Sequence, residues 1–127
     1  MANRKIVVLL SLLILTACGP RPWAQGINMS HVPPDETQAA LAVRVFDQTL
    51  PPPTPSKIIG EVRATSCKNK LWDAPATRGD ALAQLRLKAL RMGGNAVVAV
   101  TYDERGKDAL GTNCWESVTA TGTAVVL

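Results

Sequence analysis

Apolar and polar positions along the chain follow the period of strands in four places and the period of a helix in one. The predicted strands cover residues 41–46, 57–63, 95–103 and 114–127. A helix is predicted between the second and third strands, beginning at Thr77 and ending at the pair Gly93 and Gly94. This order indicates an α+β fold, a small mixed β-sheet of about four strands packed against one α-helix.

The predicted helix carries signals at both ends and an apolar face. Thr77 and Asp80 are spaced as in a capping box. Apolar side chains recur at helical spacing at Leu82, Leu85, Ala89 and Met92. Three cations suit the negative end of the helix dipole, namely Arg86, Lys88 and Arg91. Those cations form either an ordinary solvated face or a docking patch for an acidic partner.

The last two predicted strands should be buried in different ways. Residues 96–100 read AVVAV without alternation, so we expect this strand to be buried on both faces. The last strand alternates between two sets of side chains. The set expected inside is Val118, Ala120, Gly122, Ala124 and Val126. The set expected to face solvent is Ser117, Thr119, Thr121 and Thr123.

The beginning of the chain resembles an export signal. Arg4 and Lys5 precede an apolar run over residues 6–15. Ten helical residues rise about 15 Å, half of the roughly 30 Å hydrocarbon core, which is typical of a signal peptide and too short for a membrane span. The next residues, LTAC, resemble a bacterial lipobox ending at Cys18. The expected organisation is a signal peptide over residues 1–17, a lipidated flexible tether over 18–40 and a folded domain over 41–127.

The residue after the lipobox cysteine indicates the membrane to which the lipoprotein is sent. Gly19, rather than an aspartate, follows Cys18, as in lipoproteins sent on to the outer membrane. Three acyl chains would anchor the protein stably, because a single chain binds only marginally. The prolines of the tether should keep it extended, with the domain facing the periplasm.

Composition narrows the classes of function. Aromatic residues make up only 4% of the chain, so the core must consist mainly of aliphatic side chains. Without Arg4 and Lys5 the formal net charge falls from +4 to +2, and no basic run remains, which disfavours nucleic-acid binding. No nucleophile motif stands beside a base. We therefore expect a protein that is not an enzyme and needs no cofactor.

Two cysteines remain after Cys18, and they allow a single pairing, Cys67 with Cys114. In the oxidising space outside the inner membrane such a pair is expected to form a disulfide. The alternative is a pair of thiols that binds a soft metal. Two cysteines and the distant His31 fall short of a closed tetrahedral zinc site, so no metal site is predicted.

Short motifs across residues 41–127 resemble the RcsF family of outer-membrane lipoproteins. They are VRVF at 43–46, IGEV at 59–62, NAVV at 95–98 and GTNC at 111–114. This resemblance implies an envelope stress sensor that contacts an outer-membrane β-barrel protein and signals to an inner-membrane regulator of the Rcs phosphorelay. It also implies the Cys67–Cys114 bridge, whereas the second bridge of that family would need cysteines near Tyr102 and Ala120.

The helix, GGNAVVAV at 93–100 and TGTAV at 121–125 are similar to the YbjQ family of small α/β proteins. This second resemblance implies an alternative function, a self-assembling periplasmic module that binds a small ligand or a metal.

Overall fold

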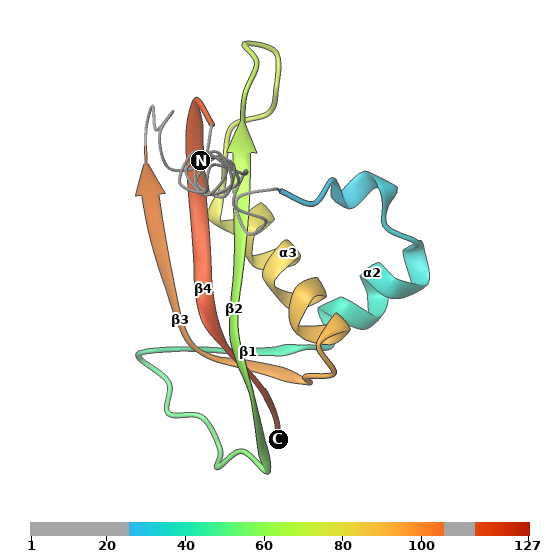
Figure 1. Cartoon of the computed structure of the whole chain (residues 1–127), viewed down its shortest axis with the longest axis vertical. Coiled ribbons are helices and arrows are strands. Elements are labelled where there is room, and N and C mark those ends of the chain that lie inside the picture. The colour runs from blue at the N-terminus through green and yellow to red at the C-terminus, as the bar shows by residue number, and fades with distance from the viewer. Residues whose placement is uncertain (1–25, 106–113) are drawn as a thin grey trace, which may run out of the picture.

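The computed structural model describes residues 26–105 and 114–127. The elements, in chain order, are the 3₁₀ turn η2 (Met29–His31), helix α2 (Pro34–Leu41), strands β1 (Arg44–Asp47) and β2 (Lys57–Lys68), helix α3 (Arg78–Arg91), and strands β3 (Ala96–Arg105) and β4 (Glu116–Val126). The four strands form one sheet in the order β1-β3-β4-β2 (Figure 1). The β1–β3 pair is parallel and the other pairs are antiparallel, so the predicted mixed sheet of an α+β fold is confirmed.

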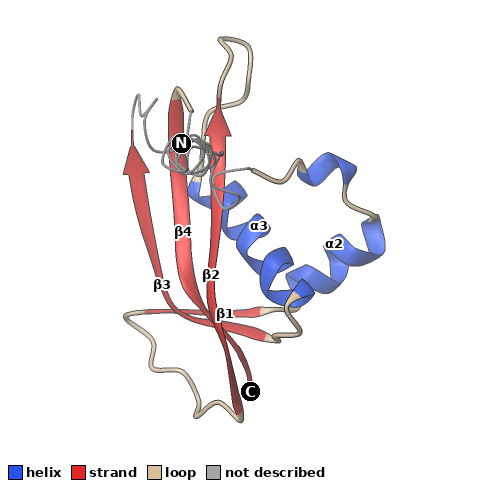
Figure 2. Ribbon diagram, viewed as in Figure 1, coloured by secondary structure: helices blue, strands red, loops and turns tan. Residues whose placement is uncertain are grey.

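Helix α3 packs on one face of the sheet, and α2 packs against α3 (Figure 2). Leu85 and Ala89 of α3 are completely buried in the core. The sheet meets them with valine and alanine side chains, the alanines being Ala64, Ala120 and Ala124. Small residues on the strands let the helix approach closely, so the core is dense although the chain has few aromatic residues.

The ends of α3 lie where the sequence predicts them. The Thr77 hydroxyl accepts the Asp80 N–H at 3.1 Å. At the other end Gly93 has a φ of 88°, and the Gly94 N–H donates to the Ala89 carbonyl at 2.9 Å, which ends the helix as glycine commonly does. Met92 is 41% exposed, contrary to the predicted apolar face, because it lies at the cap beyond the last helical turn.

A second helix, α2, lies where an extended tether was predicted. Pro34 is its first residue, where the fixed φ of proline suits a helix, and Asp35 and Glu36 follow in the first turn, where acids suit the dipole. The prolines of this stretch were interpreted as keeping the chain extended, but here they begin a helix. The predicted strand at 41–46 is correspondingly shorter and starts at Arg44.

Neither helix is long and apolar enough to cross a bilayer, within the part of the chain that the structure describes.

The predicted burial on both faces of strand β3 holds for its first two residues, since Ala96 and Val97 are both completely buried, and a bulge ends it after Val98. The register with β4 shifts between Val98 and Thr101, and Ala99 adopts a φ of 53°. The additional residue places Val97 and Val100, three positions apart, on the same buried side, while Ala99 is exposed. An apolar run without alternation therefore marks a bulge in this strand.

Strand β4 follows its predicted faces over most of its length. Val118, Ala120 and Ala124 are buried, and the threonines between them are half-buried because β4 lies between β3 and β2. Two positions differ from the prediction. Ser117 is buried opposite Cys67, and Val125 rather than Val126 is buried where the register with β2 shifts.

Candidate functional site

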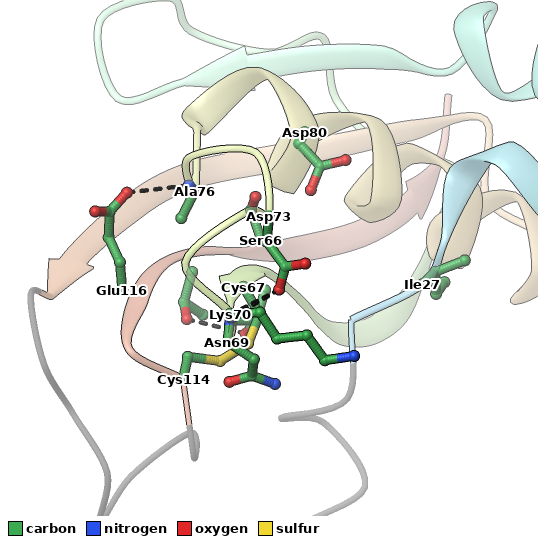
Figure 3. Close-up of a disulfide and its surroundings, with 12 residues drawn as sticks. Ile27, Ser66, Cys67, Asn69, Lys70, Asp73, Ala76, Asp80, Cys114 and Glu116 are labelled. Carbon is green, nitrogen blue, oxygen red and sulfur yellow. Dashed lines mark hydrogen bonds between the residues drawn. A yellow bond between two sulfur atoms is a disulfide. The ribbon is translucent and has the colours of Figure 1, made fainter.

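A disulfide joins the end of β2 to the residues that lead into β4 (Figure 3). The Cα atoms of Cys67 and Cys114 lie 5.5 Å apart. Beside the bridge, the Trp115 N–H donates to the Lys68 carbonyl at 2.7 Å, which extends the pairing of the two strands. The predicted pairing of these cysteines is confirmed, and both sulfur atoms are bonded to each other.

The loop from β2 to α3 is fixed at its base, next to the disulfide. Glu116 Oε1 accepts the Ala76 N–H at 3.0 Å (Figure 3). Ser66 Oγ accepts the Thr77 N–H at 3.2 Å. Both ends of this loop are thus tied to the sheet, through the disulfide and Ser66 on β2 and Glu116 on β4.

Residues 70–73 of this loop, called the apolar turn below, form a hydrogen-bonded reverse turn. The Asp73 N–H donates to the Lys70 carbonyl at 3.1 Å. The Asp73 carboxylate accepts the N–H groups of Asn69 and Lys70 at 3.1 and 2.9 Å. Leu71 and Trp72 occupy the two central positions and are 77% and 80% exposed. The sequence predicts only a loop here, because Asp73 stands at the last position of the turn, whereas aspartate is a turn signal at the first.

The chain at the N-terminal side of α2 is held against α3 by a buried glutamine that sequence reasoning missed. Gln84 is 2% exposed, and its Oε1 accepts the Ile27 N–H at 2.8 Å. Its Nε2 donates to Asp80 Oδ2 at 2.9 Å. Gly26 lies so close to β2 that a Cβ there would be 3.0 Å from the Thr65 carbonyl oxygen. The chain therefore enters the domain near the disulfide, in whose surroundings Ile27 lies (Figure 3).

Two of the three cations predicted as a docking patch already have partners within the chain. The Arg91 guanidinium contacts both carboxylate oxygens of Glu36 on α2, at 2.7 and 3.0 Å. This hydrogen bond raises the pKa of Arg91 and lowers that of Glu36. Lys88 Nζ donates to the Arg63 carbonyl at 2.8 Å, and burial lowers the pKa of Lys88.

An open groove of about 370 Å³ runs between β2 and the C-terminal end of α3. Its lining residues are Glu61, Val62, Arg63, Lys88, Arg91 and Met92. Lys88 and Arg91 are brought together here, whereas Arg86 is not part of the lining and its buried Nε has no hydrogen-bond partner among the described residues. The three cations therefore do not form a single patch: the groove contains Lys88 and Arg91 but not Arg86.

The described residues do not fit a resident metal. They contain no group of three or more His, Cys, Asp or Glu side chains that could hold an ion. Cys67 and Cys114, the softest ligands of the domain, are bonded to each other. Cys18, the predicted lipid attachment site, lies outside the described residues.

Comparison with protein families places most of the folded domain in a known family. Residues 58–127, more than half of the chain, match a family described as "Putative heavy-metal-binding" and named YbjQ. No curated protein matches the chain. The matched region runs from β2 through β4 and includes α3 and the disulfide. The chain belongs to the YbjQ family.

Proposed function

We propose that the protein is an outer-membrane-anchored lipoprotein that acts, without catalysis, by protein–protein contacts in envelope stress sensing, and that it signals to a phosphorelay as RcsF-like proteins do. The observation that carries this proposal is the Cys67–Cys114 disulfide. Structural disulfides persist in oxidising compartments and are rare in the cytosol. The disulfide therefore supports export, and the lipobox at Cys18 supports a lipid anchor in the envelope.

The groove is the surface that best suits a partner with acidic and apolar side chains. Lys88 and Arg91 line it beside Met92. Arg91 is paired with Glu36, but both side chains are partly exposed, and exposed ion pairs contribute little to stability. An acidic group on a partner could therefore replace Glu36 with little loss of folding stability. The ion pair between Arg91 and Glu36 would then give way to one between Arg91 and the partner.

The anchor is tested by Cys18→Ala in the full chain. We expect the variant to leave the membrane fraction, and we expect the parent protein to carry a diacylglyceryl modification visible by mass spectrometry. Ser30→Ala, an exposed change outside the lipobox, is the matched control and should be retained. A Cys18→Ala protein processed like the parent and still sedimenting with membranes would show that the anchor assignment is wrong.

The contact surface is tested by photo-crosslinking in cells from a reactive residue at Met92, in the groove. The control position is Thr101, which is exposed on β3 and is separated from β2 by β4. We expect adducts with an outer-membrane β-barrel protein or an inner-membrane regulator from position 92 and none from position 101. Equal adducts from both positions would contradict the assignment of the groove.

The alternative is a self-assembling YbjQ-like module that binds a small ligand or metal, and family membership is the observation behind it. Adducts containing only further copies of this chain, in a defined stoichiometry, would favour this function. Retention of Zn²⁺ or Cu²⁺ by the oxidised protein in equilibrium dialysis would also favour this function. The ligands of the ion would then have to lie outside the described residues.

A further inference from the structure

The two most exposed large apolar side chains in the described part of the protein are neighbours at the tip of the apolar turn. Trp72 is 80% exposed and Leu71 is 77% exposed, compared with 46% for Trp115 near the disulfide. A single exposed apolar side chain is common, whereas adjacent ones form a contiguous apolar surface of the kind that a partner or a membrane can cover. The apolar turn therefore presents a small apolar tip that the described residues leave largely exposed.

The turn presents these side chains in a fixed geometry. Three hydrogen bonds to Asp73 close the turn, and the disulfide at Cys67 and the Glu116 contact to Ala76 fix the loop below it. An apolar tip with its backbone already ordered loses little conformational entropy when a surface covers it.

The chemistry of the tip matches the interface between lipid headgroups and acyl chains. An indole is favoured at that depth, and leucine adds apolar area. Lys70 lies beside the indole, with Nζ 5.8 Å from the ring, and Lys68 ends the strand below. Cations at this position are attracted to anionic lipids. The Asp73 carboxylate is turned back onto backbone N–H groups of its own loop.

The position of the proposed lipid anchor brings the same end of the domain to the membrane. Seven residues separate Cys18 from Gly26, so the two positions are eight residue steps apart, a span of at most about 28 Å when fully extended. Gly26 lies against Thr65, two residues before the disulfide, so the chain joins the domain close to the apolar turn. The opposite end of β2, at Lys57, is about 27 Å further along the strand.

We infer that the apolar turn is a lipid-contacting surface, which inserts Leu71 and Trp72 into the headgroup region of the bilayer that carries the anchor. The inference rests on the proposed function, because it takes the lipid on Cys18 as given. Insertion would add a second point of attachment and would fix the domain with its disulfide end toward the membrane and its Lys57 end away from it.

The test uses the full chain, isolated from cells and reconstituted in vesicles of phosphatidylethanolamine and phosphatidylglycerol. Trp23→Phe and Trp115→Phe leave Trp72 as the sole indole. The matched control adds Trp72→Phe and Ile58→Trp, which places the sole indole on a residue that is 71% exposed at the other end of β2. Brominated acyl chains should quench Trp72 at least about twofold and leave the control within about 10% of its intensity, because an indole inserted at the headgroup level lies next to the acyl chains and one at the Lys57 end does not.

The possible outcomes distinguish the lipid-contact inference, the proposed function and contact with a second copy of the chain. An unquenched Trp72 in protein whose Cys18 is shown by mass spectrometry to carry lipid would overturn the inference and leave the proposed function standing. Absence of lipid on Cys18 would overturn the proposed function instead. A blue-shifted Trp72 that depends on protein concentration and does not need vesicles would show that a second copy covers the turn, which also overturns the inference.

Discussion

At the scale of single residues, Gly122 and the bulge at Ala99 fit one another. A Cβ on Gly122 would lie 2.6 Å from Val97 Cγ1 and 3.1 Å from the Val98 carbonyl oxygen. Both contacts belong to the part of β3 where the register shifts. The bulge brings the neighbouring strand so close that only glycine leaves enough room, and the sequence alone shows neither half of this fit.

Gly122→Ala should lower the free energy of unfolding by about 1–3 kcal/mol, because the added methyl group overpacks the core. Chemical denaturation measures the change. Gly79→Ala is the control, since its nearest neighbour is 4.0 Å away and alanine favours the first turn of α3. Unchanged stability of Gly122→Ala would mean that β3 can move aside and that the fit is loose.

Gln84→Leu should release the chain at Ile27, because the leucine offers no acceptor to the Ile27 N–H. One hydrogen bond of this kind contributes about 0.5–1.5 kcal/mol, so the Ile27 amide should exchange with solvent about two to ten times faster. Hydrogen exchange measured relative to the Leu85 amide reports this local effect. Asp80→Asn keeps Gln84 with its acceptor oxygen, and its side-chain oxygen can still accept from Gln84 Nε2, so this variant should keep the protection. Equal hydrogen exchange of the Ile27 amide in both variants would show that Gln84 does not protect it.

At the scale of elements, α2 is held to α3 by an ion pair whose strength depends on pH. The hydrogen bond from Arg91 lowers the pKa of Glu36 below its ordinary 4.5. A carboxyl group with a lowered pKa adds stability above its unfolded pKa and loses it as the pH falls through the folded pKa. The contribution is small, because the pair is partly exposed.

Glu36→Gln should therefore be slightly less stable than the parent at pH 7, and this difference should vanish as the pH falls below 4.5 and through the lowered pKa. Denaturation curves at pH 7 and at pH 3 measure it. Asp35→Asn, one position earlier in the same helical turn, controls for effects of the helix dipole. A difference between Glu36→Gln and parent that persists at pH 3 would assign the effect to something other than the charge.

Helices and strands could be predicted where the residues that specify them lie close together in the sequence. The cap at Thr77, the glycines after α3 and the alternation in β4 all act within a few residues. Helix α2 was missed because a proline pair suits both an extended chain and a helix start, and the contact with Arg91 that favours the helix is 55 residues away. The groove and the apolar turn depend on such distant or side-chain contacts, which no period in the sequence shows.

At the scale of the whole molecule, the disulfide closes a loop with a sequence separation of 47 residues that contains α3 and β3. In the loop-entropy model such a bridge contributes about 4 kcal/mol, a large share of the stability of a small domain. Its pairing was predictable because only two cysteines remain after Cys18. The strand order could not be predicted, because the order in the sheet, β1-β3-β4-β2, departs from the order along the chain.

Cys67→Ser and Cys114→Ser should each lower the free energy of unfolding by about 2–4 kcal/mol, and the double variant should be no less stable than either. Thermal and chemical denaturation measure these losses, and reduction of the parent protein should reproduce them. Losses that add in the double variant would show that each cysteine contributes separately rather than through a shared bond.

The position of β4 has a consequence for the export that we propose. Of the four strands in the described residues it comes last along the chain, yet it lies inside the sheet, between β3 and β2, and it is the strand that pairs with β2. A polypeptide that passes through a translocation pore with its amino end first therefore delivers β2 well before its partner: Lys57 pairs with Val126. Pairing between residues so far apart is slow, because the intervening chain must first be ordered. For a chain exported as we propose, this topology would leave the emerging part without its β2–β4 pairing until the segment from Glu116 onward has come through.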